Sequence, residues 1–109
     1  MDENINDWIS KKITSNDVVL FMKGTPDTPQ CGFSSQVVQI LNYLGIEFSS
    51  VNVLEDESIR NGIKEYTNWP TIPQLYVKNE FIGGADIVRE MFEENELKEF
   101  LKDKGIATN

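Results

Sequence analysis

Two residue types that commonly build metal and redox sites are scarce in this chain. Histidine is absent, and cysteine occurs once, at Cys31. A single cysteine excludes a disulfide within the chain. A zinc site within one chain is not expected either, because several carboxylates would have to complete the ligand set around one thiolate. Any disulfide or metal site that uses this thiol therefore needs groups from another molecule.

Positive charge and long apolar runs are also scarce. The 109 residues carry a net charge of -8. Phosphate backbones and anionic lipids would repel such a chain, so we expect no nucleic acid and no membrane as partner. The start, "MDENINDWISKK", has no apolar centre and little arginine or serine, unlike a signal or transit peptide. We expect a bacterial cytoplasmic protein or, as a second choice, a processed protein of an organelle matrix.

Apolar periodicity predicts a single domain over residues 1–109. The expected helices cover 4–13, 32–44, 56–66, 86–93 and a short stretch around 97–101; the expected strands cover 17–22, 47–54, 74–77 and 80–84. The first strand, helix and strand would form a right-handed parallel unit. Helix and strand order predicts an α/β, thioredoxin-like fold, with a four-stranded mixed sheet (βαβ plus ββα) flanked by helices. Such a fold does not by itself define a function.

The thiol of Cys31 stands immediately before the predicted helix 32–44. Unpaired N–H groups and the helix dipole favour a thiolate there, which is the nucleophilic and metal-binding form. The alternative is an inert cysteine buried in the core; the small and polar neighbours favour a reactive one. Ser34 stands where a dithiol motif has its second cysteine. It is either a helix residue whose hydroxyl bonds to the backbone, the mark of a site without a resolving thiol, or both.

Two further stretches contain candidate binding groups. In "TIP", Pro73 is either a plain strand start or a cis turn that exposes the N–H and C=O of Ile72 beside the thiol. In "FIGGADIV", Gly84 and the following helix start could bind an anion while Asp86 accepts from an ammonium group. The simpler alternative is a turn with Asp86 as an ordinary cap and Ile87 facing inward, and this stretch alone favours it.

Basic residues are expected near these groups in an otherwise acidic chain. Lys23 follows the first strand, and Arg60 and Lys64 lie on the helix before "NWPTIP". Two helix N-termini, an exposed backbone edge and these cations would surround one thiol. The implied ligand is a small, anionic, peptide-like molecule with its own thiol, and glutathione meets that description.

The stretches "FMKGTPDTPQCGFS", "NWPTIPQLYV" and "FIGGAD" together resemble those of the CGFS-type monothiol glutaredoxins, over almost the whole chain. The resemblance implies a thioredoxin fold, a cis bond at Pro73, Cys31 as the active thiol and Phe33 as a shield of the site. The residues it implies for glutathione binding are Lys23, Arg60 or Lys64, Thr71, Ile72, Gly84, Ala85 and Asp86. The family often has a cysteine at the position of Ala85, so thiol chemistry ascribed to that position cannot occur here.

The same resemblance implies a [2Fe–2S] cluster and weak glutathione-dependent redox activity. Such a cluster commonly uses four thiolates. One chain has a single cysteine, so two chains and two glutathione molecules would complete the set. A cluster thus predicts a homodimer bridged by the cluster, or a mixed dimer, with Cys31 as the metal ligand and with apo iron–sulfur or other assembly proteins as recipients. The alternative is an oxidoreductase acting on protein–glutathione mixed disulfides; a regulatory binding module has no separate motif.

Overall fold

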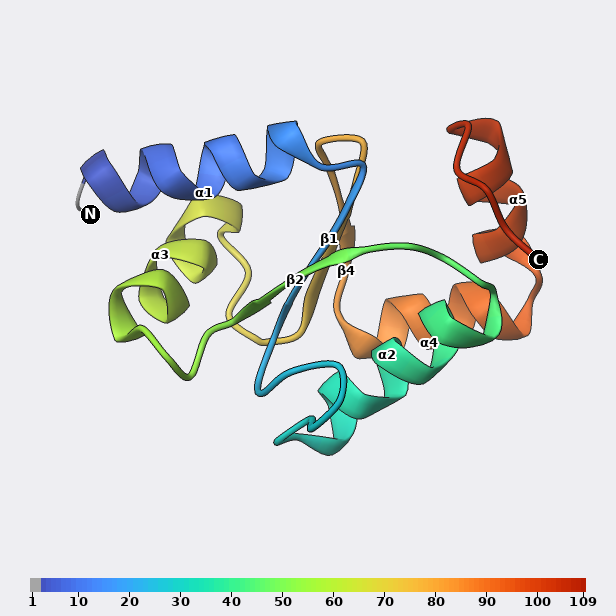
Figure 1. Cartoon of the computed structure of the whole chain (residues 1–109), viewed down its shortest axis with the longest axis horizontal. Coiled ribbons are helices and arrows are strands. Elements are labelled where there is room, and N and C mark those ends of the chain that lie inside the picture. Colours follow the sequence, from blue (N-terminus) through green and yellow to red (C-terminus); the bar gives the residue numbers. More distant parts are fainter. Residues whose placement is uncertain (1–2) are drawn as a thin grey trace.

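A mixed four-stranded sheet with helices on both faces forms the computed structural model, which describes residues 3–109 (Figure 1). The elements in chain order are α1 (Glu3–Ser15), β1 (Val18–Met22), α2 (Gly32–Tyr43), β2 (Ser49–Asn52), α3 (Glu57–Thr67), β3 (Gln74–Val77), β4 (Glu80–Gly83), α4 (Ala85–Glu93) and α5 (Glu96–Asp103). The strand order is β2-β1-β3-β4. β1 pairs with β2 in parallel and with β3 antiparallel, and β3 pairs antiparallel with β4. The predicted thioredoxin-like arrangement is confirmed.

Strand β1 divides the interior into two cores, because successive side chains of a strand point to opposite faces. Val18, Leu20 and Met22 pack in the core formed with α2, α4 and α5. Val19 and Phe21 pack in the other core, formed with α1 and α3. All five side chains are buried, which explains why this strand reads as a continuous apolar run rather than an alternating one.

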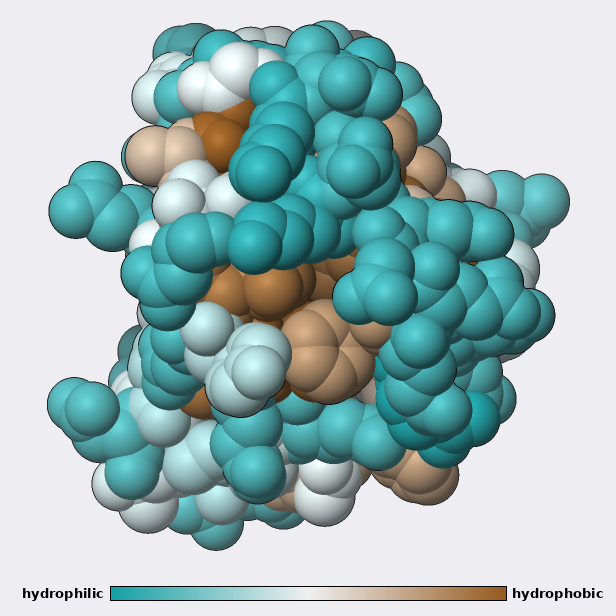
Figure 2. All heavy atoms as spheres, turned by 90° about the vertical axis from the view of Figure 1, so that its right-hand side faces the viewer, coloured by the Kyte–Doolittle hydropathy of each residue, from teal (hydrophilic) through white to brown (hydrophobic). Residues whose placement is uncertain are grey.

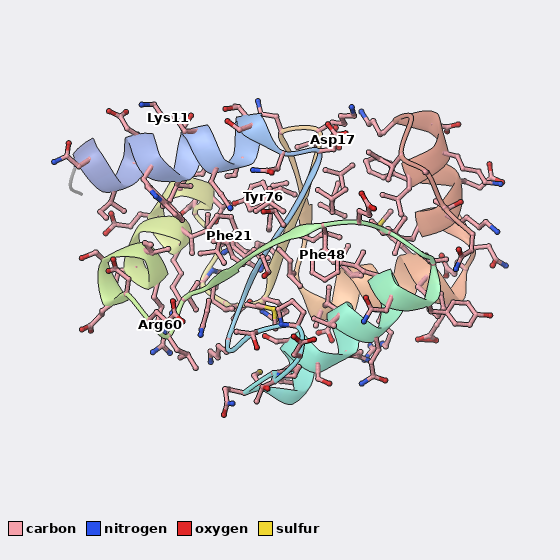
Figure 3. The ribbon with its side chains drawn as sticks, in the orientation of Figure 1. Lys11, Asp17, Phe21, Phe48, Arg60 and Tyr76 are labelled. Atoms are coloured by element: carbon pink, nitrogen blue, oxygen red, sulfur yellow. The ribbon has the colours of Figure 1, made fainter. Side chains whose placement is uncertain are left out.

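The second core contains an aromatic pair that crosses from β1 to β3. The rings of Phe21 and Tyr76 meet edge to face with centroids 5.7 Å apart. Figure 3 shows both near the centre of the molecule, whereas Lys11 and Arg60 lie toward the outside of α1 and α3. Edge-to-face packing adds to the stabilisation from burial alone.

The turn between β3 and β4 occurs where the sequence predicted it. Lys78 and Asn79 both have positive φ, 49° and 67°, as in the turns that match the twist of a hairpin. The Lys78 N–H donates to the Asp17 carbonyl at 2.7 Å, and its ammonium group pairs with the Asp17 carboxylate at 3.0 Å. These contacts fasten the hairpin to the segment before β1.

Two expectations about the helix after β4 are wrong. The helix begins at Ala85 with Gly84 as its N-cap, so Asp86 lies in the first turn and is not the cap. Ile87 is 37% exposed, whereas Val88 is fully buried. Ala85 and Val88 are one helical turn apart and define the inward face. Ile87 lies about 100° around the helix from Val88 and therefore reaches the rim.

The surface is described by its hydropathy on one face of the molecule. On the face that carries α5 and the C-terminus, hydrophilic side chains dominate, and apolar side chains are visible in a hollow (Figure 2).

Strand β2, at the edge of the sheet, covers Ser49–Asn52, less than the predicted 47–54. No helix within residues 3–109 is long and apolar enough to cross a membrane.

Candidate functional site

One cavity of about 410 Å³ collects side chains from the ends of several elements. It lies where β1 runs into its loop, where α2 and α4 begin, and beside the turn before β3. The predicted site residues among its lining are Lys23, Cys31, Phe33, Lys64, Thr71, Ile72, Pro73, Gly84, Ala85 and Asp86. The structure thus brings together every predicted site residue except Arg60.

Cys31 is the N-cap of α2, with extended backbone angles and a partly exposed thiol. Partial burial opposes ionisation, but it is outweighed by the Ser34 and Phe33 backbone N–H groups, the Lys23 charge and the Ser34 hydroxyl, so the pKa of Cys31 lies below its ordinary value of 9.0. The neutral thiol makes no side-chain capping bond to the helix; these N–H groups favour the thiolate. The inert, core-buried alternative does not describe this cysteine.

Ser34 connects the thiol to the end of β1. Its side chain is fully buried, and its Oγ accepts a hydrogen bond from the Lys23 N–H at 3.1 Å. The hydroxyl hydrogen remains available for the thiolate of Cys31, whose pKa it helps to lower. The hydrogen bond between the Ser34 hydroxyl and the backbone, one of the two interpretations of this residue, is therefore present in the structure.

The loop between β1 and Cys31 is held by backbone and amide contacts. Asn52 Oδ1 accepts from the N–H groups of Gly24 at 2.9 Å and Leu54 at 3.0 Å, which joins the ends of β1 and β2. Gly24 has φ +90°, and a Cβ there would stand 2.6 Å from Gln30 N and Thr28 O. Only glycine fits this position without displacing the loop that leads to the thiol.

The turn before β3 has a cis peptide bond between Ile72 and Pro73. Ile72 precedes β3, and its backbone makes no backbone hydrogen bond among residues 3–109. The residue is 6% exposed, and it lines the cavity together with Cys31. The backbone of Ile72 is thus free to pair with an extended ligand in the manner of an added strand.

Gly84 allows this turn to approach the start of α4. A Cβ at Gly84 would stand 3.3 Å from Pro73 O, 3.5 Å from Trp69 Nε1 and 3.9 Å from Thr71 Oγ1. Trp69 Nε1 is buried without a hydrogen-bond partner. Trp69, with Pro70 and Ile87, also lines the cavity and was missed. The signal for the first two was their place beside Thr71 in "NWPTIP".

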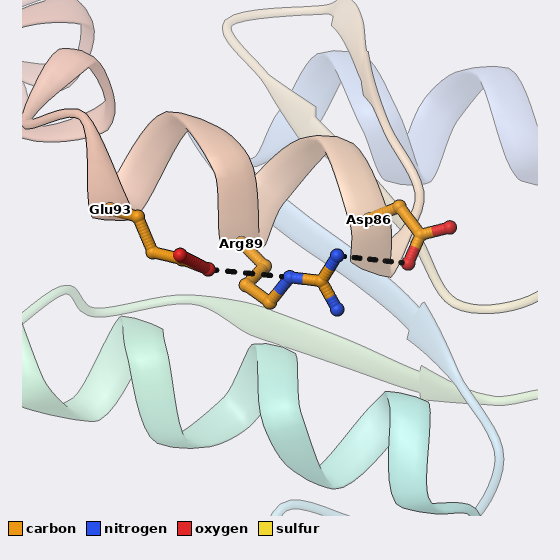
Figure 4. A network of polar contacts seen from close by, with 3 residues as sticks. All are labelled: Asp86, Arg89 and Glu93. Atoms are coloured by element: carbon orange, nitrogen blue, oxygen red, sulfur yellow. Dashed lines mark ion pairs between the residues drawn. The ribbon is translucent and has the colours of Figure 1, made fainter.

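Asp86 is already engaged in an ion pair on the surface of α4. The Arg89 guanidinium lies 3.7 Å from its carboxylate and 3.4 Å from that of Glu93 (Figure 4). The Asp86 side chain is 80% exposed, and exposed pairs of this kind contribute little. A ligand ammonium group can therefore compete for Asp86 at small cost.

Two cations face the cavity in a chain of net charge -8. Neither Lys23 nor Lys64 belongs to any ion pair within residues 3–109. Arg60 is one helical turn before Lys64, is not among the lining residues, and has a buried Nε without a partner. Over the same residues, no group of three or more histidine, cysteine or acidic side chains comes together to hold a metal ion.

A thioredoxin-like fold with one partly exposed thiol at a helix N-terminus, facing a cis-proline turn, defines a single-thiol protein of the thioredoxin superfamily. The chain belongs to the glutaredoxin family, whose sequence model matches residues 18–82. It is 53% identical over 105 residues to the probable monothiol glutaredoxin 2 of Rickettsia typhi, with 95% of each chain covered. It is 58% identical over 94 residues to an uncharacterized monothiol glutaredoxin of Synechocystis, covering 86% of this chain and 88% of that protein.

Solved structures give the same picture. The solution structure of a monomeric truncated mutant of 1-C-Grx1 from Trypanosoma brucei superposes with a TM-score of 0.88 at 45% identity, covering 95% of this chain and 94% of that one. Reduced apo GrxS14 from poplar superposes with a TM-score of 0.80 at 53% identity, covering 92% of both chains. The predicted relationship to the monothiol glutaredoxins is thereby confirmed.

Proposed function

We propose that this chain binds a [2Fe–2S] cluster together with glutathione and delivers it in iron–sulfur cluster assembly. The observation that carries the proposal is the partly exposed Cys31 thiol at the cavity, with a pKa lowered by its surroundings. A thiolate is the form that binds iron. Because the chain has one cysteine and no histidine, every other thiolate or imidazole ligand has to come from another molecule.

The donor set fits a shared cluster. Four thiolates are the usual ligands of a [2Fe–2S] centre, and one chain supplies Cys31 alone. Two chains and two glutathione molecules complete the count. External ligands make the cargo releasable, because loss of bound glutathione removes half of the donors.

Glutathione would occupy the cavity beside Cys31. Lys23 and Lys64 would attract its carboxylates, the Ile72 backbone would pair with its peptide, and Asp86 would accept from its ammonium group. Thr71, Pro73, Gly84 and Ala85 line the same cavity and would contact it. The two carboxylates and the single ammonium group of such a peptide match the two cations and the one carboxylate of the lining.

A second copy of the chain would cover the rim of the cavity. Phe33 is 58% exposed beside Cys31, and Ile87 is exposed across the cavity. Contact with a second copy would remove these two apolar side chains from water, which is favourable. We propose a homodimer that forms around the cluster, with a mixed dimer as the variant in which another protein replaces one copy, and a bacterial cytoplasm or an organelle matrix as its compartment.

Anaerobic reconstitution with iron, sulfide and glutathione tests the proposal. The unsubstituted chain should become a coloured dimer, as measured by visible absorbance and size-exclusion chromatography. The Cys31→Ser variant should stay colourless and monomeric, whereas Ser35→Ala, one helical turn further along α2, should behave like the unsubstituted chain. A colourless monomer from the unsubstituted chain under these conditions contradicts cluster binding.

The lowered pKa of Cys31 also favours a second function, reduction of protein–glutathione mixed disulfides. The Cys31 thiolate would attack the glutathione sulfur, forming a Cys31–glutathione disulfide and releasing the protein thiolate. A second glutathione thiolate would then attack that disulfide, releasing oxidised glutathione and restoring Cys31. Rapid turnover of a glutathionylated protein by a chain that binds no cluster would make this the main function.

A further inference from the structure

Gln74 is a polar side chain sealed in the interior. It opens β3 and is fully buried. Among residues 3–109, Ser34 is the other fully buried polar side chain. Because strand side chains alternate, Gln74 lies on the same face of the sheet as Tyr76, toward the core formed with α1 and α3. Burial of an amide is tolerated when its hydrogen bonds are made.

Both the NH₂ group and the carbonyl oxygen of the Gln74 amide form hydrogen bonds. Its Nε2 donates to the carbonyls of Trp69 and Thr71, each at 3.2 Å. Its Oε1 accepts from the Tyr76 hydroxyl at 3.0 Å, with Thr67 Oγ1 at 3.2 Å. Carbonyl oxygens cannot donate, so the NH₂ group must face Trp69 and Thr71, and the orientation of the amide is fixed.

We propose that Gln74 is a positioning residue for ligand binding: its buried NH₂ group bridges the carbonyls on either side of Pro70 and so holds Thr71 and Ile72 against the cavity. The inference rests on the proposed glutathione site and adds the residue that shapes its backbone edge. Gln74 itself does not line the cavity, so it acts through the turn and not by touching the ligand.

The reason lies in how this turn is supported. Residues 68–73 belong to no helix or strand. The Trp69 N–H donates to the Lys64 carbonyl at 3.1 Å, but no backbone N–H of residues 3–109 reaches the carbonyl of Trp69 or that of Thr71. The two bonds from Gln74 span the segment at both of those carbonyls. Without them the turn would sample other arrangements, and apparent affinity falls in proportion to the population of the competent one.

Two substitutions separate the halves of the amide. Gln74→Glu keeps an oxygen for Tyr76 and replaces the NH₂ group, which donates to the carbonyls of both Trp69 and Thr71, by an oxygen that can donate to only one of them, and only when the carboxyl group is protonated. Tyr76→Phe leaves that donor intact and removes one bond to Oε1. Tyr76 is a matched control because it is equally interior, at 3% exposed, and burial raises the pKa of its phenol so that it stays a neutral donor.

Reduced glutathione is titrated into each variant well below its unfolding temperature, with backbone amide NMR shifts as the readout. Gln74→Glu should weaken binding at least about fivefold, as expected for a competent population of about one fifth or less, and shift the Thr71 and Ile72 signals of the free protein. Tyr76→Phe should bind within about twofold of the unsubstituted chain. Gln74→Met serves if the buried carboxylate prevents folding. Equal affinities, or equal losses in both variants, overturn the inference.

Hydrogen exchange of the unsubstituted chain gives an arm that needs no variant. The Gln74 side-chain NH₂ protons should exchange far more slowly than those of Gln39, whose amide bonds to Ser35 at the surface. Exchange as fast as that of Gln39 contradicts the bridging geometry. If the unsubstituted chain binds no glutathione, both the proposed glutathione site and this inference are wrong. If it binds and Gln74→Glu binds equally, the inference alone falls.

Discussion

Gly24→Ala measures how strongly the loop before the thiol depends on one glycine. Gly24 has φ +90°, and its N–H donates to Asn52 Oδ1 at 2.9 Å. Positive φ costs an alanine about 1–2 kcal/mol. The new Cβ would also meet Gln30 N and Thr28 O at 2.6 Å. These are backbone atoms that cannot rotate away, so overpacking adds about 1–3 kcal/mol. The free energy of unfolding should fall by about 2–5 kcal/mol in all.

The matched control is Gly105→Ala. Gly105 has φ +79°, but nothing lies within 4 Å of its Cβ position, so only the conformational cost of about 1–2 kcal/mol applies. Urea unfolding of both variants, followed by circular dichroism with an unchanged m-value, gives the comparison. The difference between them isolates the loop contacts. Equal losses of stability in the two variants would refute the claim that the packed loop, and not the backbone angle alone, requires glycine at Gly24.

The remaining predictions concern charge at the cavity. The alkylation rate of Cys31 should rise with pH around a midpoint below 9.0. Ser34→Ala should move that midpoint upward, and Ser35→Ala should leave it in place. If the pH–rate profiles of Ser34→Ala and of the unsubstituted chain coincide, the buried hydroxyl does not lower the pKa of Cys31. Because folding lowers this pKa, the folded state binds fewer protons in that window, and the free energy of unfolding should rise with pH between the folded and unfolded values. Lys64→Ala should weaken glutathione binding about two- to fivefold at low salt, and Arg60→Ala should weaken it less. The difference in affinity between the two variants should shrink as salt is added. Equal losses of affinity, measured by titration, would mean that both cations lie at the ligand.

Regular elements could be predicted from the sequence because their signal is local. The apolar run that ends at Met22 and the helical stripe that follows Cys31 give bounds within one or two residues of those observed. The prediction failed where backbone geometry decides the outcome. Gly84 as N-cap moves the helix start ahead of Asp86 and leaves Ile87 at the rim, and no periodicity reveals that shift.

The residues that line the candidate site were easier to predict from the sequence than the residues that hold the lining in place. Motifs identify residues that meet a ligand, whereas Gln74 reads as one letter of a strand, "QLYV". Its partners lie at Trp69 and Thr71, in a turn whose path no local pattern specifies. Likewise, Asn52 is 28 residues from Gly24, whose N–H it binds. Such contacts depend on how the elements pack, and they become visible only in three dimensions.

Three buried or partly buried polar side chains have a common architecture. Ser34, Asn52 and Gln74 each bond to the backbone of a segment that lines or borders the cavity. A polar group left unpaired in the interior costs about 1–3 kcal/mol. Moving any of these segments away from its side-chain partner would therefore lower the free energy of unfolding. The cavity therefore keeps its shape without a ligand, and ordering costs on binding stay small. Substitutions at these positions should lower stability and affinity together, whereas substitutions of Lys23 or Lys64, which form no ion pair in the described chain, should lower affinity alone.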